Sequence, residues 1–282
     1  MQLIHSVAEL RELISQRRLA GDRIGFVPTM GALHEGHLSL VELAQQKCEF
    51  VVVSVFVNPL QFGANEDFDK YPRALGIDSN LLADHEVDVL FAPSSSEVYP
   101  SANPVKQLTA GSIGQGFEGE IRPGHFDGML TVVNRLFDIV QPDCAFFGQK
   151  DAQQVALVKQ MLKEQIGSGS RSPIELVVGP TIRSEDGLAL SSRNKFLSEE
   201  DMPAALSLSR ALFAGSKGRT RDEVLNLTRA EISAQAKLEY LELVDADSFE
   251  PTELGLGLAV LIVAARVGEV RLLDNVYIDR KS

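Results

Sequence analysis

The sequence contains no tryptophan, and only two of its 282 residues are cysteines. Cys48 and Cys144 stand far apart along the chain, which argues against a disulfide framework and fits a reducing compartment. The longest apolar run, near residues 258–265, is much shorter than the ~20 residues that a membrane-spanning helix needs. The first five residues show no pattern of a secretory signal. We therefore expect a cytoplasmic protein with no membrane partner.

An excess of positive charge is also lacking. The chain has 27 Lys and Arg against 39 Asp and Glu, a formal net charge of −12. Proteins that bind nucleic acid gain much of their affinity by neutralising phosphates, so we expect no nucleic-acid partner. No GxxxxGK[ST] motif occurs, which argues against a P-loop enzyme. Any anion site must gather its cations locally, and the candidates are Lys150, Arg183, Arg193, Arg122 and Arg73.

Apolar strands alternate with amphipathic helices over the first two thirds of the chain. Strand, helix and strand at this spacing form βαβ units, which pair their strands in parallel. The sequence therefore predicts an α/β fold with a doubly wound, Rossmann-like nucleotide-binding domain. The expected strands are 23–28, 50–57, 88–91, 144–147 and 174–178. The expected helices are 6–18, 36–46, 73–85, 128–140 and 152–165.

The pattern changes in the last third of the chain. Two helices are expected at 199–214 and 221–237, followed by strands near 238–244, 258–267 and 270–277. Helices followed by strands favour a smaller α+β domain. We predict a Rossmann-like nucleotidyltransferase domain over residues 1–179 and a C-terminal lid domain over residues 180–282.

His34 and His37 follow the first buried strand and open a helix expected from Gly36. Residues at i and i+3 are neighbours on a helix face, where the positive end of the helix dipole also favours an anion. Zinc is disfavoured because the zincin pattern places its histidines at i and i+4. Taken alone, the pair would more often cap the helix or serve the structure. Both rings can donate hydrogen bonds to phosphate oxygens as charge develops during a reaction.

Two further segments carry polar groups suited to a nucleotide. Gly148-Gln149-Lys150-Asp151 follows a strand and opens a helix, so glycine permits close approach and lysine supplies a charge. Ser191-Ser192-Arg193 offers two hydroxyls and a guanidinium to phosphate oxygens. An ordinary turn and an ordinary serine-rich loop are the alternatives. With the histidine pair, these segments favour nucleotidyl transfer.

The histidine motif and the Ser-Ser-Arg loop resemble the HxGH and KMSKS-like pair of the nucleotidylyltransferase superfamily. Six ordered blocks make the resemblance narrower, and together they resemble the pantothenate synthetase (pantoate–β-alanine ligase) family. The blocks are PTMGALHEGH (28–37), FVNPLQF (56–62), YPR (71–73), RPGHF (122–126), FGQKDAQQ (147–154) and LALSSRN (188–194).

This resemblance implies a ligase that condenses pantoate with β-alanine through a pantoyl adenylate, with ATP as co-substrate and Mg²⁺ as cofactor. It implies catalytic roles for His37, which matches the proton donor, and for His34, Lys150 and Arg193. It also implies a homodimer. The residues assigned to ATP are Met30, Gly31, Ala32, Leu33, His34, Glu35, Gly36, His37, Gly148, Gln149, Lys150, Asp151, Ile182, Leu190, Ser191, Ser192 and Arg193.

The resemblance also assigns the acid and the amine. Pantoate is expected on Gln61 and Gln154, and β-alanine on Gln61. Asn58, Tyr71, Arg122 and His125 are expected to line the same cleft. Asp78 is predicted to contact the magnesium ion through water, because Mg²⁺ on ATP phosphates keeps several waters.

Three other functions remain open from the sequence. A nucleotidylyltransferase would stop at the nucleotide-linked product and would need no amine. A regulatory nucleotide-binding module would not need so many donors for developing charge. A tRNA synthetase is disfavoured by the acidic charge and by the absence of lysine from the Ser191 block.

Overall fold

The computed structural model describes residues 1–63, 68–69 and 71–279. The chain divides into two compact units, which are described separately. The first unit comprises Met1–Gly148 and Leu157–Gly179, and the second comprises Gln149–Ala156 and Pro180–Ser282. The assignment of a nucleotide-binding role to residues 1–179 and a lid role to residues 180–282 stays a prediction.

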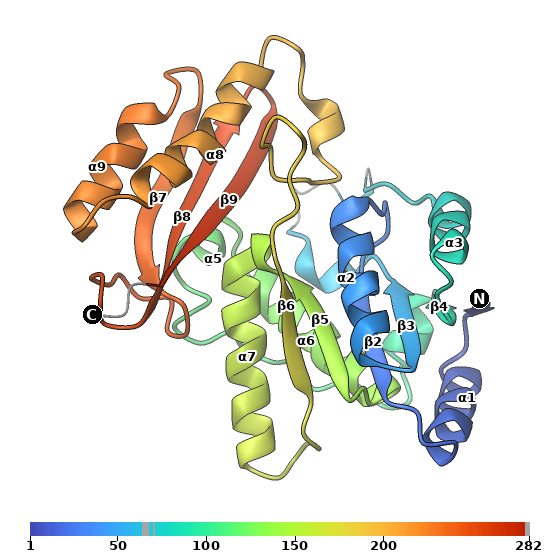
Figure 1. Ribbon diagram of the computed structural model, residues 1–282. Coiled ribbons are helices and arrows are strands. Elements are labelled where there is room, and N and C mark those ends of the chain that lie inside the picture. The colour runs from blue at the N-terminus through green and yellow to red at the C-terminus, as the bar shows by residue number, and fades with distance from the viewer. Residues whose placement is uncertain (64–67, 70, 280–282) are drawn as a thin grey trace. The chain divides into compact units, whose positions relative to one another are not determined.

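The first unit is built on a parallel six-stranded sheet in the order β1-β4-β3-β2-β5-β6 (Figure 1). Its strands are β1 (Gln2–Ile4), β2 (Ile24–Thr29), β3 (Phe50–Val55), β4 (Val89–Phe91), β5 (Cys144–Gly148) and β6 (Glu175–Gly179). The helices along this part of the chain are α1 (Val7–Leu19), α2 (Glu35–Lys47), α3 (Leu75–Asp84), α4 (Ser95–Val98), α5 (Glu118–Ile121), α6 (His125–Val140) and α7 (Ala152–Gly167). Two short 3-10 turns are η1 (Pro59–Gln61) and η2 (Gln149–Asp151).

Apolar side chains cover both faces of the sheet, because successive residues of a strand point to opposite sides. On one face, Val27 of β2 belongs to a buried cluster with Val41 of α2. On the other face, the Phe26 ring lies edge-on to Phe137 of α6, with centroids 6.3 Å apart. Figure 1 shows α2 in front of the strands and α6 behind them. The predicted doubly wound, Rossmann-like sheet is thus confirmed.

The strand order reverses at β2, which pairs with β3 on one side and with β5 on the other. Ligands of such sheets bind beyond the carboxyl ends of the strands, at the point of reversal. Here β2 leads into residues 30–34 at the start of α2, and β5 ends at Gly148. Both segments carry residues that the sequence predicts for the site.

The second unit contains an antiparallel sheet in the order β7-β8-β9. Its strands are β7 (Lys237–Asp245), β8 (Leu258–Val267) and β9 (Val270–Asp279), and its helices are α8 (Met202–Gly215) and α9 (Arg221–Glu231), with a short turn η3 (Asn194–Phe196). Leu208 and Leu212 of α8 pack with Leu243 and Leu261 of the sheet in one buried cluster. This arrangement confirms the smaller α+β part of the fold.

Several elements differ from the expectation, among them the end of α9 and strand β1. The helix expected at 221–237 ends at Glu231, because Ile232 is extended and the Ser233 N–H donates to Ser207 Oγ at 3.0 Å. Strand β1 was not predicted, since three residues are too few to show a period. Among the described residues, no helix combines the length and apolar character that crossing a bilayer requires.

Candidate functional site

The predicted site residues fall into both compact units. The first unit contains Met30, Gly31, Ala32, Leu33, His34, Glu35, Gly36, His37, Asn58, Gln61, Tyr71, Asp78, Arg122, His125 and Gly148. The second contains Gln149, Lys150, Asp151, Gln154, Ile182, Leu190, Ser191, Ser192 and Arg193. The assignment of these residues to substrates stays a prediction.

The loop after β2 turns sharply before α2 begins. Thr29 Oγ1 donates to Ser54 O at 2.6 Å and accepts from the N–H of Gly31 at 3.2 Å, which closes the turn. Gly31 has a φ of +83°, and a side chain there would bring Cβ within 2.9 Å of Val55 and Asp78. Glycine is therefore required at this position.

The start of α2 brings His34 and His37 together. His34 is extended and forms the N-cap, where its Nδ1 accepts from the N–H of Gly36 at 3.1 Å. His37 Nδ1 accepts in turn from the N–H of His34 at 3.3 Å. His34 therefore lies just before the helix, whose observed start at Glu35 is one residue from the expected start at Gly36, and His37 lies in its first turn. The ring centroids are only 4.2 Å apart.

These two contacts determine which ring nitrogen carries the proton when each imidazole is neutral. A backbone N–H can only donate, so each Nδ1 must be an unprotonated acceptor. The proton of each neutral ring then lies on Nε2. The capping alternative left open by the sequence is therefore present at both rings, and donation from Nε2 to a phosphate stays a prediction.

Asp78 of α3 anchors the segment before the histidines. Its Oδ2 accepts from the N–H of Ala32 at 3.0 Å and its Oδ1 from the N–H of Leu33 at 2.9 Å. The side chain is almost fully buried, with Asp78 only 1% exposed. Ala32 has a φ of +52°, which is costly for a residue with a Cβ and is held here by this contact. The carboxylate thus serves the loop, and its contact with a magnesium ion stays a prediction.

Asn58 and Gln61 form a buried amide pair next to the β2 loop. Asn58 Nδ2 donates to Gln61 Oε1 at 3.2 Å, and Gln61 Nε2 donates to Met30 Sδ at 2.9 Å. The hydroxyl of Tyr99 donates to Asn58 Oδ1 at 2.8 Å. Sequence reasoning missed Tyr99, because a tyrosine 41 residues away carries no local signal of this contact.

His125 contacts the short turn η1, and Arg122 contacts His125. His125 Nδ1 donates to Gln61 O at 2.8 Å, since a carbonyl can only accept. Its Nε2 lies 3.1 Å from Arg122 Nη1 and accepts from that guanidinium. Tyr71 is buried and lies edge-on to Phe62, with ring centroids 5.8 Å apart. Asn58 and His125 thus contact Gln61, Arg122 contacts His125, and Tyr71 packs against Phe62, the residue after Gln61. All four are predicted to line the substrate cleft.

In the second unit, Asn275 of β9 holds the turn that carries Lys150. Its Nδ2 donates to Gln149 O at 3.0 Å and to Lys150 O at 2.8 Å. Lys150 Nζ lies 3.6 Å from Asp151 Oδ1. Asn275 is 2% exposed and was missed because a single asparagine in a strand has no distinguishing pattern. Gln154 follows in the first turn of α7 and is half-buried.

The Ser191 loop is also tied down within the second unit. The N–H of Leu190 donates to Ile182 O at 2.9 Å, so these two predicted residues lie side by side. Ser191 Oγ accepts from the N–H of Arg193 at 3.3 Å. Arg183 pairs with Asp274 through two contacts of 2.6 and 2.8 Å, so it stabilises the unit and is committed to that carboxylate.

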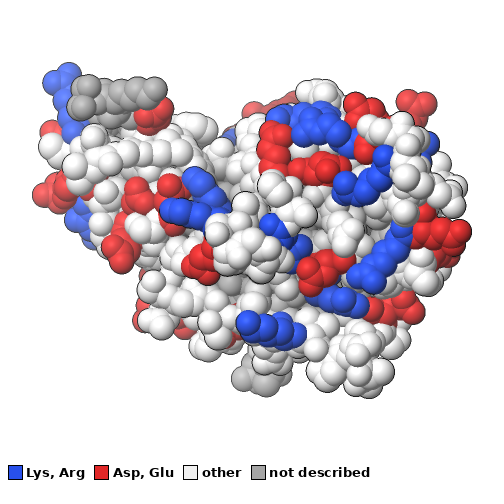
Figure 2. All heavy atoms as spheres, turned by 90° about the horizontal axis from the view of Figure 1, so that it is seen from below, with Lys and Arg blue, Asp and Glu red and all other residues white. Residues whose placement is uncertain are grey.

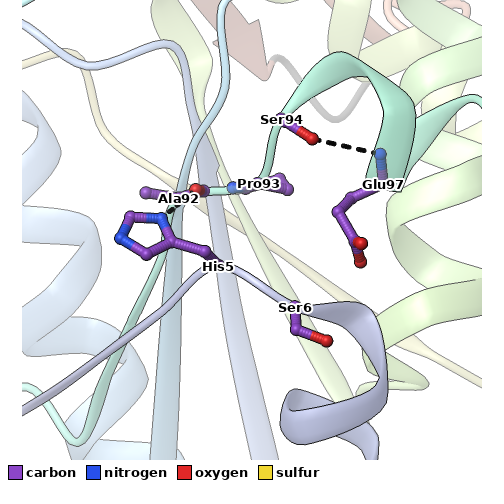
Figure 3. A pocket seen from close by; sticks show the side chains of 6 residues that line it. All are labelled: His5, Ser6, Ala92, Pro93, Ser94 and Glu97. Atoms are coloured by element: carbon purple, nitrogen blue, oxygen red, sulfur yellow. Dashed lines mark hydrogen bonds between the residues drawn. The ribbon is translucent and has the colours of Figure 1, made fainter.

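The first unit has a surface pocket of about 440 Å³ at the carboxyl ends of β1 and β4 (Figure 3). His5 Nδ1 contacts Ala92 O at 2.6 Å, and Glu97 Oε2 accepts from the N–H of Val7 at 2.7 Å. These groups hold β1 and α1 against the sheet, and none is predicted for the site. The lining residues are His5, Ser6, Ala92, Pro93, Ser94 and Glu97.

Lys and Arg side chains are interspersed with Asp and Glu on the face shown in Figure 2. Ion pairs of the described residues include Arg23 and Lys47 with Glu175, at 3.3 and 2.5 Å.

Known proteins resemble the chain over nearly its whole length. A family model described as pantoate-beta-alanine ligase matches residues 2–277. The pantothenate synthetase of a Nocardioides species is 47% identical over 285 residues, covering 97% of this chain and 84% of that protein. The pantothenate synthetase of Pseudomonas putida is 45% identical over 285 residues, covering 99% and 98%.

Solved structures also resemble the chain over nearly its whole length. The crystal structure of pantothenate synthetase from Thermus thermophilus is 44% identical with a TM-score of 0.88, covering 98% of this chain and 99% of that one. The pantoate-beta-alanine ligase of Francisella tularensis, complexed with beta-gamma ATP and beta-alanine, is 36% identical with a TM-score of 0.80, covering 98% and 97%.

Proposed function

Because the chain belongs to the pantoate–β-alanine ligase family, we propose that this ligase condenses pantoate with β-alanine and converts ATP into AMP and pyrophosphate. The observation that carries the proposal is the start of α2, where two imidazoles with protonated Nε2 atoms adjoin the positive end of a helix dipole. The Francisella relative, whose structure holds an ATP analogue and β-alanine, supports the choice of co-substrates.

In the first half-reaction, a carboxylate oxygen of pantoate attacks the α-phosphorus of ATP. The bond from that phosphorus to the bridging oxygen breaks, and pyrophosphate leaves with the electron pair. The product is a mixed anhydride, pantoyl adenylate. Activation is required because a free carboxylate is a poor acyl donor to an amine, whereas AMP is a good leaving group.

We propose that donors at the histidine pair and in the second unit stabilise the negative charge that develops on the phosphate oxygens. The Nε2–H groups of His34 and His37 would donate to phosphate oxygens, and donors aimed at developing charge are commonly the largest catalytic contribution. Lys150 and Arg193 would supply positive charge, and the hydroxyls of Ser191 and Ser192 further donors.

We propose that side-chain amides bind pantoate, because an amide can donate hydrogen bonds to carboxylate and hydroxyl oxygens without carrying a charge. Gln61 and Gln154 would hold pantoate, and Gln61 also β-alanine. Asn58 and His125 touch the side chain and the backbone of Gln61, which supports a role in orienting it.

In the second half-reaction, the neutral amine of β-alanine attacks the acyl carbonyl. AMP leaves as the amide bond forms, and the nitrogen loses one proton. Water must be excluded in the interval, because it would hydrolyse the adenylate. The lid role of residues 180–282, the homodimer and the cytoplasmic location stay predictions.

Magnesium belongs to the proposal through ATP, whose phosphates it neutralises when bound. Among the described residues, no group of three or more His, Cys, Asp or Glu side chains could hold a metal ion. Asp78 does not suit direct ligation, since it is buried and both of its oxygens already accept backbone N–H groups. The ion would therefore be held by phosphate oxygens and water.

The proposal is tested by product analysis with ATP and pantoate, with and without β-alanine. We expect pantothenate and free AMP to form in equal amounts only when all three substrates are present. Formation of ADP and phosphate, or turnover that does not depend on pantoate, would contradict the assignment. A nucleotidylyltransferase would instead release a stable adenylated product without an amine.

A further inference from the structure

A chain of polar contacts leads from Tyr99 to Gln61. The hydroxyl of Tyr99 lies 2.8 Å from Asn58 Oδ1, and Asn58 Nδ2 lies 3.2 Å from Gln61 Oε1. Asn58 and Gln61 are 1% and 7% exposed, so water does not compete freely for these groups. Asn58 also contacts two backbone groups, the N–H of Leu60 at 3.2 Å and the carbonyl of Gly128 at 3.0 Å.

The two backbone groups determine which end of the Asn58 amide is which. The N–H of Leu60 can only donate, so the Asn58 atom facing it must be the oxygen. The carbonyl of Gly128 can only accept, so the atom facing it must be the nitrogen. The hydroxyl of Tyr99, which also faces the oxygen, must therefore donate its proton to Asn58.

The orientation of the Asn58 amide also determines the orientation of the Gln61 amide. Because Asn58 presents its nitrogen, the Gln61 atom facing it must be the oxygen, and the nitrogen of Gln61 is then the donor at the other end. That nitrogen contacts Met30 Sδ at 2.9 Å. A thioether sulfur is a weak acceptor, so an oxygen of a bound acid could replace it at little cost.

We propose that Tyr99 is a positioning residue that acts through Asn58 to hold Gln61 with its Nε2 amide as the donor toward an oxygen of the acid substrate. The inference rests on the proposed function, because Gln61 is assigned to pantoate there. It adds a direction to that assignment: the site selects an acceptor oxygen, a carboxylate or a hydroxyl, at this point.

Tyr99 is suited to this task by its surroundings. It forms the C-cap of α4, where its N–H donates to Ser95 O at 2.8 Å, and its ring lies against Phe56 with centroids 6.2 Å apart. Burial raises the pKa of the Tyr99 phenol above its ordinary value, so the hydroxyl keeps its proton. Since ring packing holds the side chain, removal of the hydroxyl alone should leave the fold intact.

The first test is steady-state kinetics of Tyr99→Phe with pantoate, β-alanine and ATP. Loss of one neutral hydrogen bond should raise KM for pantoate about three- to tenfold, while kcat and KM for ATP change less than about twofold. Tyr277→Phe, which removes the hydroxyl of a tyrosine in β9, is the matched control and should leave KM for pantoate unchanged.

Two further variants separate positioning from a general structural effect. In a Gln61→Ala background, Tyr99→Phe should cause no additional rise in KM for pantoate, because its effect passes through Gln61. Gln61→Glu places an oxygen where the donor was and should weaken pantoate more than Gln61→Ala does. Additive effects of the two substitutions, or wild-type pantoate binding by Gln61→Glu, would overturn the proposal.

A measurement without turnover keeps this inference separate from the proposed function. In protein labelled with ¹⁵N in its Asn and Gln side chains, the Asn58 and Gln61 amide protons should exchange slowly with water. Tyr99→Phe should speed that exchange, and Tyr277→Phe should not. Unchanged exchange in Tyr99→Phe would refute the positioning role. Inactivity of the wild-type enzyme toward pantoate, with faster exchange in Tyr99→Phe, would refute only the assigned substrate.

Discussion

The imidazole rings of His34 and His37 lie 4.2 Å apart, and His37 Nδ1 accepts a hydrogen bond from the backbone N–H of His34. The same contact that caps α2 therefore assigns the proton of the neutral His37 ring to Nε2. His34 is assigned in the same way through the N–H of Gly36. Capping of α2 thus determines which nitrogen of each neutral ring is left to donate to the proposed nucleotide.

Two substitutions of His34 distinguish its capping role from its predicted role as a hydrogen-bond donor. Asparagine is among the best N-cap residues, so His34→Asn should retain the stability of α2 but lose the Nε2–H donor. We expect kcat to fall about 10²–10³-fold, as for other lost donors to developing charge, with little change in Tm. His34→Ala should lose activity similarly and about 1 kcal/mol of stability as well.

Thermal unfolding and the rate of pantothenate formation check both variants. Full activity in a folded His34→Asn enzyme would show that His34 serves only as a cap.

Asp78 should matter through the loop that it anchors. Asp78→Asn replaces one acceptor oxygen with an amide nitrogen, which leaves the N–H of Ala32 or Leu33 without its partner. We expect a loss of about 1–3 kcal/mol in the free energy of unfolding, together with reduced activity at saturating magnesium. Asp84→Asn, at the exposed end of the same helix, is the control.

Denaturant titration with and without magnesium measures this effect. Destabilisation of Asp78→Asn in the absence of magnesium supports the anchor. An unchanged free energy of unfolding combined with a raised magnesium requirement would favour metal contact instead.

Gly128 permits α6 to approach the turn that carries Gln61. A Cβ at this position would lie 2.0 Å from Leu60 O, too close for any side chain. Gly128→Ala must therefore displace η1 or α6, and we expect a lower Tm and a higher KM for pantoate. Gly76→Ala in α3 meets nothing within 4 Å and should stabilise the helix by up to about 1 kcal/mol. A neutral Gly128→Ala variant would contradict the geometry of this contact.

The two cysteines should be unreactive in the folded enzyme. Both are buried, and burial raises the pKa of the Cys48 thiol to about 12 and raises that of Cys144 as well. A raised pKa leaves roughly one thiol in 10⁴ of Cys48 as thiolate at pH 8, and the thiolate is the form that reacts. Iodoacetamide should modify neither residue before unfolding and both after it, as mass spectrometry would report. Rapid native alkylation would contradict the burial.

The parts of the fold that sequence predicts best are those determined by local pattern. The continuous apolar runs of β2 and β3, followed by the helix from residue 35, indicate a βαβ unit without tertiary information. Strand β1 is too short for a period, and its pairing with β4 comes from residues 87 positions away. Its existence depends on that contact alone.

The candidate site shows the same division. The histidine pair and the Ser191 loop stand out because several polar residues adjoin in sequence. Tyr99 and Asn275 do not, since their roles arise from contacts with Asn58 and Lys150, 41 and 125 positions away. Sequence alone could not choose between a capping and a ligand-binding role for His34, because capping statistics favour serine and aspartate. The acceptance through Nδ1 is a property of the folded turn.

The most direct test of the mechanism follows an oxygen atom. Pantoate labelled with ¹⁸O in its carboxylate is incubated with the enzyme, ATP and β-alanine, and the products are analysed by mass spectrometry. Attack of the carboxylate on the α-phosphorus predicts that one labelled oxygen appears in AMP when the amide forms. Label in inorganic phosphate, or unlabelled AMP from a complete turnover, would contradict the adenylate route.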